Sequence, residues 1–210
     1  MFRTPRPAAL GAVVALALTV GLSACQAGTE AAAEISASPS ASPTPTTSPS
    51  PSASPTPEDP AKAAKAKNIA AAKQRYLEYQ AIASKHGKKG ENPFRVLMSG
   101  GYIGSAELQE SEQSYWEQFA DLGLKETGNA SLDVVEATKY EGDPLKKDVT
   151  GQRVRMEVCI DSSAADVVRP DGTSTLQKGG PDRVLMKVTM QGQQGGLWSV
   201  NENTSTGKKC

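Results

Sequence analysis

A run of 22 residues near the N-terminus, residues 36–57, strongly limits what this chain can fold into. It contains only Ser, Pro, Thr and Ala, with seven prolines, eight serines and four threonines. Such a segment has too little apolar surface to bury and favours a solvated, polyproline-like extension. It therefore predicts a spacer with a reach of roughly 70 Å when fully extended, at about 3.1 Å per residue. Its hydroxyl groups are also candidates for sugar attachment.

The residues before this spacer have the three parts of a secretory signal. Two arginines precede an apolar stretch from Ala8 to Val20, which is too short to cross a bilayer comfortably. The sequence Leu22-Ser23-Ala24-Cys25 follows and resembles the bacterial lipobox, in which a lipid is attached to the cysteine before cleavage. We therefore expect residues 1–24 to be a lipoprotein signal peptide and Cys25 to carry the lipid. The alternative is an ordinary signal peptide that is cut near Ala24.

Two acyl chains on Cys25 would hold the protein on the membrane, because each buried methylene contributes about 0.8 kcal/mol. The expected localisation is the extracytoplasmic face of the cell membrane, with the membrane as a partner through the lipid anchor. Residues 25–58 are then the lipidated cysteine and a disordered tether, and residues 59–210 are one globular domain.

The charge balance argues against nucleic-acid binding. The whole chain has 23 basic and 23 acidic residues. Residues 1–24 contain two of the basic residues and no acids, so the mature chain has a formal balance of −2. A nucleic-acid-binding domain usually needs a basic face to neutralise phosphates. No nucleic-acid partner is therefore expected.

The globular domain opens with a long helical pattern. Asp59 suits a helix N-cap and Pro60 the first helical turn. The Ala- and Lys-rich stretch that follows predicts an amphipathic helix that ends at Gly87. The residues expected on its buried face are Ile69, Ala72, Tyr76, Tyr79 and Ala83.

Two shorter helices are expected next. Asn92-Pro93 predicts a helical segment that stops at Gly100-Gly101, and Ser105 suits the N-cap of another helix. The buried stripe expected on this last helix consists of Leu108, Tyr115, Phe119 and Leu122, widened by Trp116.

After Gly128 the apolar residues alternate, which indicates strands. The alternation predicts strands near residues 132–140, 154–160, 184–190 and 197–200. The segments between them carry turn residues such as Pro170-Asp171-Gly172. Helices followed by hairpin-linked strands predict an α+β domain in which the N-terminal helices pack on one face of an antiparallel sheet of about four strands.

Several features together resemble a known group of proteins. They are Leu22-Ser23-Ala24-Cys25, the Ser/Pro/Thr tether, the long helix, Val158-Cys159-Ile160-Asp161, the hairpin Val167-Val168-Arg169-Pro170-Asp171-Gly172, Leu197-Trp198-Ser199-Val200 and the terminal Gly-Lys-Lys-Cys210. This layout is similar to that of actinobacterial cell-envelope lipoproteins of the nuclear-transport-factor-two-like (cystatin-like) class. The resemblance implies a curved sheet wrapped around helices to form a cone-shaped pocket. The class includes isomerases, dehydratases and non-catalytic binding modules, so the fold alone does not fix an activity.

The three cysteines fit an exported protein. With Cys25 assigned to the lipid, Cys159 and Cys210 remain as an even pair in an oxidising compartment and are predicted to form a disulfide. Closing a loop of about 50 residues would stabilise the fold by about 4 kcal/mol in the chain-entropy model. The alternative is two free thiols. The chain has no second cysteine pair or histidine cluster for zinc, so no metal is expected.

Residues suited to catalysis are few. The one histidine, His86, lies beside lysines at the expected end of the long helix, where a cation that complements the helix C-terminus is favoured over a general base. Enzymes of the resembled class generally use an Asp, His or Tyr inside the cone. The candidates for such a pocket here are Tyr102, Tyr115, Tyr140, Asp133, Glu157 and Asp161, although core packing and ion pairing on a solvated sheet explain them without chemistry.

Two functions from different classes follow. The favoured one is a non-catalytic binding or interaction module of the cell envelope, which binds a protein or a small molecule. The alternative is a small pocket enzyme, an isomerase or a hydrolase. No catalytic residue and no cofactor is assigned. An open apolar pocket with a converging acid or tyrosine would favour ligand binding or catalysis. A pocket filled by side chains would instead place the function on the outer surface of the domain.

Overall fold

The computed structural model describes residues 59–176 and 180–210 of this chain. Its helices are α1 (Pro60–Gly87), α2 (Phe94–Ser99) and α3 (Ala106–Asp121). Its strands are β1 (Lys125–Gly128), β2 (Ser131–Glu141), β3 (Arg153–Asp161), β4 (Ala165–Val168), β5 (Arg183–Gly192) and β6 (Trp198–Ser205), with a short 3-10 turn η1 (Gln194–Gly196) before β6. The predicted signal peptide, Cys25 and the Ser/Pro/Thr segment lie outside the described residues. No helix within the described ranges is long and apolar enough to cross a bilayer.

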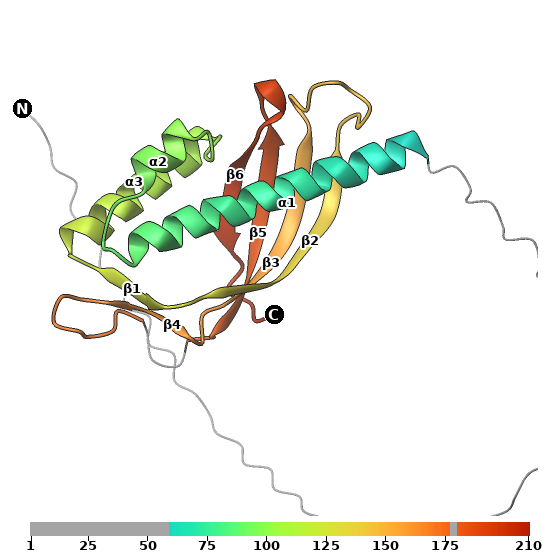
Figure 1. Ribbon diagram of the computed structural model, residues 1–210. Helices are drawn as coiled ribbons and strands as arrows, with labels where there is room; N and C mark the ends of the chain where they lie inside the picture. The colour runs from blue at the N-terminus through green and yellow to red at the C-terminus, as the bar shows by residue number, and fades with distance from the viewer. Residues whose placement is uncertain (1–58, 177–179) are drawn as a thin grey trace, which may run out of the picture. The chain divides into compact units, whose positions relative to one another are not determined.

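The main sheet has four antiparallel strands in the order β2-β3-β5-β6, and α1 crosses one face of it (Figure 1). This confirms the predicted α+β class. The register of β2 against β3 shifts twice, between Leu132 and Val134 and between Ala137 and Lys139. A third shift lies between Thr189 and Met190, where β5 pairs with β6. Such irregularities bend strands and increase their twist, so they account for the curvature of the sheet.

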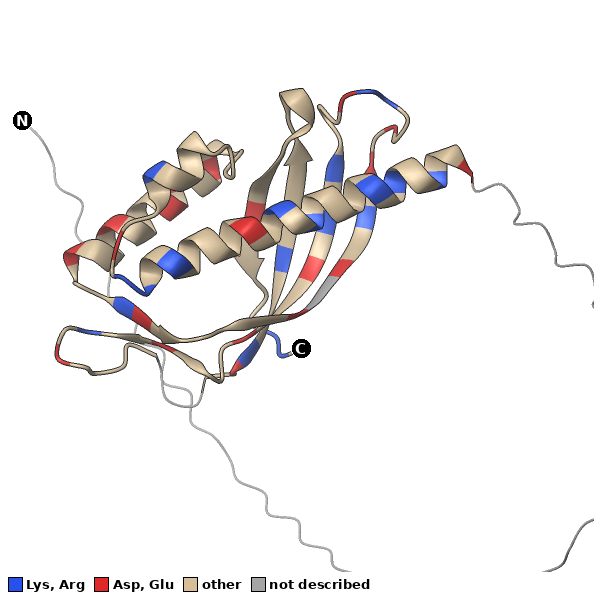
Figure 2. Ribbon diagram, viewed as in Figure 1, with Lys and Arg blue, Asp and Glu red and all other residues tan. Residues whose placement is uncertain are grey.

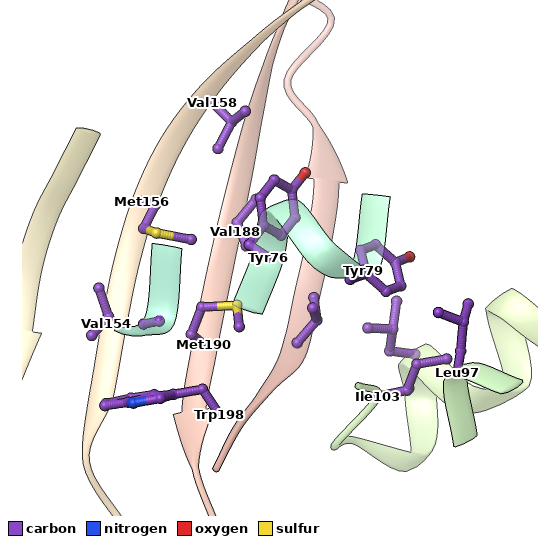
Figure 3. Packing of buried hydrophobic residues seen from close by; sticks show 13 residues of the cluster. Tyr76, Tyr79, Leu97, Ile103, Val154, Met156, Val158, Val188, Met190 and Trp198 are labelled. Atoms are coloured by element: carbon purple, nitrogen blue, oxygen red, sulfur yellow. The ribbon is translucent and has the colours of Figure 1, made fainter. Parts of the chain in front are cut away.

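The core lies between α1 and the sheet. Tyr76 of α1 projects toward side chains of β3 and β5, among them Val158 and Val188 (Figure 3). Val154, Met156 and Val158 are all buried, as the strict alternation in β3 predicts. Trp198 of β6 and Leu97 of α2 extend the same core.

Local signals place the helix boundaries where they were expected. The Asp59 carboxylate accepts a hydrogen bond from the Ala61 amide at 2.9 Å and caps α1. The Ser105 hydroxyl accepts one from the Leu108 amide at 3.1 Å and caps α3. Between these two caps, Gly101 follows the end of α2 and has a φ of 66°.

Charged residues recur along the strands of the main sheet (Figure 2). The side chains packed against α1 are apolar, and the charged ones lie on the opposite, outward face. Lys139 and Arg155 lie 2.7 Å and 3.4 Å from Glu141 on this face. Charged side chains alternate with apolar ones along the strands, and this alternation determines which face of the sheet packs against α1.

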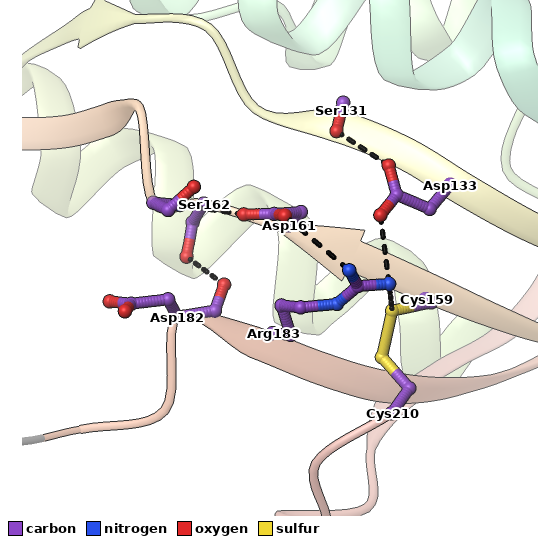
Figure 4. A network of polar contacts seen from close by, with 9 residues as sticks. Ser131, Asp133, Cys159, Asp161, Ser162, Asp182, Arg183 and Cys210 are labelled. Carbon is purple, nitrogen blue, oxygen red and sulfur yellow. Dashed lines mark hydrogen bonds and ion pairs between the residues drawn. A yellow bond between two sulfur atoms is a disulfide. The ribbon is translucent and has the colours of Figure 1, made fainter. Parts of the chain in front are cut away.

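The structure contains the predicted disulfide between Cys159 and Cys210, with a Cα–Cα distance of 5.8 Å (Figure 4). Cys159 points away from Val158 and α1, so the C-terminal tail lies on the outward face of β3. The tail is also held by main-chain bonds, since the Leu185 amide donates to the Lys208 carbonyl at 2.9 Å. Cys159 is only 1% exposed, and an Arg183 guanidinium nitrogen lies 3.5 Å from its sulfur.

Two expectations need correction. Tyr115 and Leu122 were expected in the buried stripe of α3, but they are 50% and 58% exposed. The buried line runs instead through Leu108, Trp116 and Phe119. In addition, β1 and β4 form a separate two-stranded ribbon, which the alternation pattern did not predict because both strands are only four residues long.

Candidate functional site

The candidate site is an open groove with a volume of about 970 Å³. It lies between the C-terminal half of α1, the middle of α3 and the β1–β4 ribbon, and it reaches the start of β2 and the end of β3. These elements border the same space at the end of the molecule where α1 meets β1 (Figure 1). The volume is near the upper end of the range of ligand pockets, about 300–1,000 Å³.

The walls of the groove carry exposed apolar side chains. Leu77 of α1, Tyr115 of α3 and Leu176 after β4 are 37%, 50% and 51% exposed, and all three line it. Tyr115 is held by edge-to-face packing on Trp116, with ring centroids 4.9 Å apart. Large apolar side chains that converge on one concave surface are typical of binding sites.

A carboxylate is fixed in the groove by two donors. The Tyr79 hydroxyl donates to Glu112 Oε1 at 2.5 Å, and the Trp116 indole donates to Glu112 Oε2 at 2.9 Å. Glu112 and Trp116 are four residues apart on α3, so they lie on one helix face. Each carboxylate oxygen therefore has a partner, and the side chain is held in one orientation.

The polar contacts continue beneath Glu112 into the core. The Tyr76 hydroxyl donates to Asn203 Oδ1 at 3.2 Å and accepts from Gln80 Nε2 at 2.8 Å. Burial raises the pKa of Tyr76 to about 12. Burial also raises the pKa of Tyr79 above its usual range, and the negative charge of Glu112 adds to the rise. Both phenols are therefore neutral donors at physiological pH.

A second carboxylate, Glu126 of β1, lines the groove opposite the end of α1. Burial raises its pKa, while the Ser84 hydroxyl and the charge of Lys88 oppose the rise. A Cβ atom at Gly87 would lie 2.5 Å from Glu126 Cδ, so the glycine provides the space that this side chain occupies.

Lysines form one end of the groove. Lys85, Lys88 and Lys89 all line it and are exposed. Lys88 donates to Asn129 Oδ1 at 2.5 Å, and Lys89 lies 3.8 Å from Glu91. Basic residues are clustered where α1 ends beside β1 (Figure 2).

The structure does not bring the three candidate tyrosines together. Tyr115 lines the groove. Tyr102 stacks under Arg75 at 3.5 Å, and Tyr140 donates to Gln152 near the N-terminal half of α1. Neither of the latter two lines the groove, and their contacts are those of structural residues.

The candidate acids of the sheet also lie elsewhere. Asp133 and Asp161 lie 2.8 Å and 3.9 Å from Arg183, beside the disulfide (Figure 4). Glu157 lies opposite Lys187 in the register of β3 and β5, on the charged face of the sheet. His86 contacts Glu91 at 2.9 Å and does not line the groove.

Sequence reasoning missed Glu112, Glu126 and Asn203. Glu112 lies on the buried line of α3, but it reads as a polar interruption of that line. The spacing of Leu108, Glu112, Trp116 and Phe119 was the available signal, because it places the carboxylate on the same face as three buried side chains. Nothing local in the sequence marks Glu126 or Asn203, since long-range pairing brings them to the site.

The arrangement is suited to binding. Within the described part of the chain, no group of three or more His, Cys, Asp and Glu side chains is placed to hold a metal ion. The carboxylate of Glu112 accepts one hydrogen bond on each oxygen, from Tyr79 and Trp116, and is therefore held in place. An apolar wall with a few fixed polar groups is the usual composition of a small-molecule site.

Comparisons with known proteins leave the family open. No protein-family model and no curated protein sequence matches this chain. Among solved structures, the intermembrane space region of the chloroplast protein ARC6 is similar, with 14% identity and a TM-score of 0.41. The match covers 71% of this chain and 98% of that one. A likeness of this degree implies no shared activity.

Proposed function

We propose that this chain is a membrane-anchored extracytoplasmic lipoprotein whose folded domain is a non-catalytic binding module. Lipid on Cys25 provides the anchor, and residues 36–57 provide the spacer between the anchor and the domain. The groove between α1, α3 and the β1–β4 ribbon is the binding site. Its occupant is a largely apolar molecule, in keeping with the apolar walls.

The observation that carries the proposal is the exposure of Leu77, Tyr115 and Leu176 around one concavity of about 970 Å³. Exposed large apolar side chains scattered singly are ordinary, but a converging set marks an interaction site. Tyr115 is packed against Trp116, so the wall is preorganised. A rigid wall lowers the entropy cost of binding.

The alternative, a pocket enzyme, has weaker support from the site. A general base must face the proton that it abstracts, within hydrogen-bond distance. Both oxygens of Glu112 already accept hydrogen bonds. Glu126 has a raised pKa, but one side of it is filled by Gly87 and Ser84.

Binding of the neutral fluorescent dye Nile red tests the groove. The protein for this test is residues 25–210 with Cys25→Ser, which removes the lipid and retains every described residue. We expect saturable binding at one site. Ala81 is exposed and lines the groove, so Ala81→Trp fills it and weakens binding at least about tenfold, the effect of losing about 1.4 kcal/mol.

Ala66→Trp is the matched control, because Ala66 is an exposed residue of the same helix outside the groove. It should bind Nile red like the parent protein. Equal binding by the Ala81→Trp and Ala66→Trp proteins, or no saturable binding at all, would refute the assignment of the groove. Circular dichroism of both variants establishes that they are folded.

A further inference from the structure

The charges around the groove indicate what kind of apolar molecule it takes. Its three acidic side chains are already engaged. Glu112 accepts from Tyr79 and Trp116, and Asp166 Oδ1 accepts from Ser174 and the Val167 amide. Glu126 has the Ser84 hydroxyl and the charge of Lys88 beside it. Lys85, in contrast, is exposed and has no hydrogen-bond or ion-pair partner among the described residues. Among the described charged groups that line the groove, the one without a partner is therefore the ammonium group of Lys85.

The partial negative charge at the C-terminal end of α1 does not account for the presence of Lys85 and Lys88. A helix C-terminus is equivalent to about half a negative charge. The Ser84 carbonyl already accepts from the Lys88 amide, and the His86 carbonyl accepts from Lys89 and Glu91 amides, each at 3.0 Å. His86 and Lys89 face Glu91. The helix end therefore does not require Lys85 or Lys88, and of the two only Lys88 has an acidic neighbour among the described residues of the groove, Glu126.

The lysines and the apolar wall lie along one line of the helix. Leu77, Ala81, Lys85 and Lys88 follow one another at spacings of three or four residues, which places them on the same face. All four line the groove. The line from Leu77 to Lys88 is about 16 Å long at 1.5 Å per residue, with apolar contacts at one end and two ammonium groups at the other.

We propose that the groove binds a single-chain anionic lipid, with its acidic head group at Lys85 and Lys88 and its alkyl chain against Leu77, Tyr115 and Leu176. This inference rests on the proposed function of the groove and specifies its ligand. Lys88 already donates to Asn129 and keeps two further donor hydrogens for the head group.

Three amphiphiles that share a twelve-carbon chain test the head group: dodecanoate, 1-dodecanol and dodecyltrimethylammonium. Binding to residues 25–210 with Cys25→Ser is followed by the fluorescence of Trp116, which lines the groove. We expect dodecanoate to bind about tenfold more tightly than dodecanol, as two ion pairs of up to about 1 kcal/mol each allow. The double variant Lys85→Gln, Lys88→Gln should abolish this preference, so that dodecanoate and dodecanol bind with equal affinity.

Lys62→Gln, Lys67→Gln is the matched control, because it removes the same charge from exposed residues of α1 outside the groove. It should keep the tenfold preference. Equal binding of dodecanoate and dodecanol by the parent protein would overturn the anionic head group and leave the groove assignment intact, as would tighter binding of the ammonium compound. Binding of none of the three would overturn both proposals.

Discussion

Removal of the disulfide between Cys159 and Cys210 should cost this domain a large part of its stability. The two cysteines are 51 residues apart in the sequence, and a cross-link over such a loop contributes about 4 kcal/mol in the chain-entropy model. Domains of this size have unfolding free energies of only about 5–15 kcal/mol. The double variant Cys159→Ala, Cys210→Ala is therefore expected to be marginally stable.

Urea unfolding measures this loss. With a slope of about 2 kcal/mol per molar urea, 4 kcal/mol corresponds to a fall of about 2 M in the unfolding midpoint. Tryptophan fluorescence reports the transition, because Trp116 and Trp198 are both buried. The parent protein treated with a reducing agent should unfold near the midpoint of the double variant, and the reducing agent should not affect the variant itself.

The chain-entropy reasoning would be refuted by a loss below about 1 kcal/mol in the double variant with an unchanged urea slope. That result would mean that main-chain contacts hold the tail without the covalent bond, such as the one from the Leu185 amide to the Lys208 carbonyl. A changed slope would instead locate the effect in the compactness of the unfolded chain.

Three further predictions concern other parts of the chain. Cys25→Ala should move the protein from the membrane to the soluble fraction on cell fractionation, and the parent protein should carry the mass of a diacylglyceryl group. Arg75→Lys should lower the unfolding free energy by about 2 kcal/mol in urea titrations, because lysine loses both the stacking on Tyr102 and the bond from Nε to the Trp198 carbonyl at 3.2 Å. Glu126→Gln should raise the melting temperature at pH 7: burial raises the pKa of Glu126 in the folded state, so its ionised form opposes folding above that pKa. The gain should vanish as the pH falls below the usual range of a glutamic acid, and a gain that persists at low pH would contradict this reasoning.

The order and type of the main elements could be predicted because their signals are local. The Asp59 cap, the strict alternation in β3 and the turn at Pro170-Asp171-Gly172 each depend on a few neighbouring residues. The pairing of Cys159 with Cys210 followed from counting cysteines in a chain that was expected to be exported. All of these agree with the structure.

The groove could not be predicted in the same way. It is formed by α1, α3, β1 and β4, whose contacts join residues far apart in the sequence. The expected stripe of α3 placed Tyr115 in the core because an aromatic residue at helical spacing usually packs inward. The actual buried line includes Glu112, a carboxylate that becomes acceptable there only because Tyr79 and Trp116 donate to it.

The first turns of α1 have a mechanical consequence under the proposed N-terminal anchor. Residues 60–67 contain no buried side chain. The Lys65 ammonium lies 5.9 Å from the centroid of the Tyr140 ring, and Asn68 is the first of the described residues whose side chain hydrogen-bonds to the sheet, to Tyr140 at 2.9 Å. Under tension these eight residues can unwind from about 1.5 to about 3.3 Å each, lengthening the chain by roughly 14 Å. This extension would take up an applied displacement before the tension reaches Tyr76. The N-terminal turns of α1 would therefore protect the groove from strain.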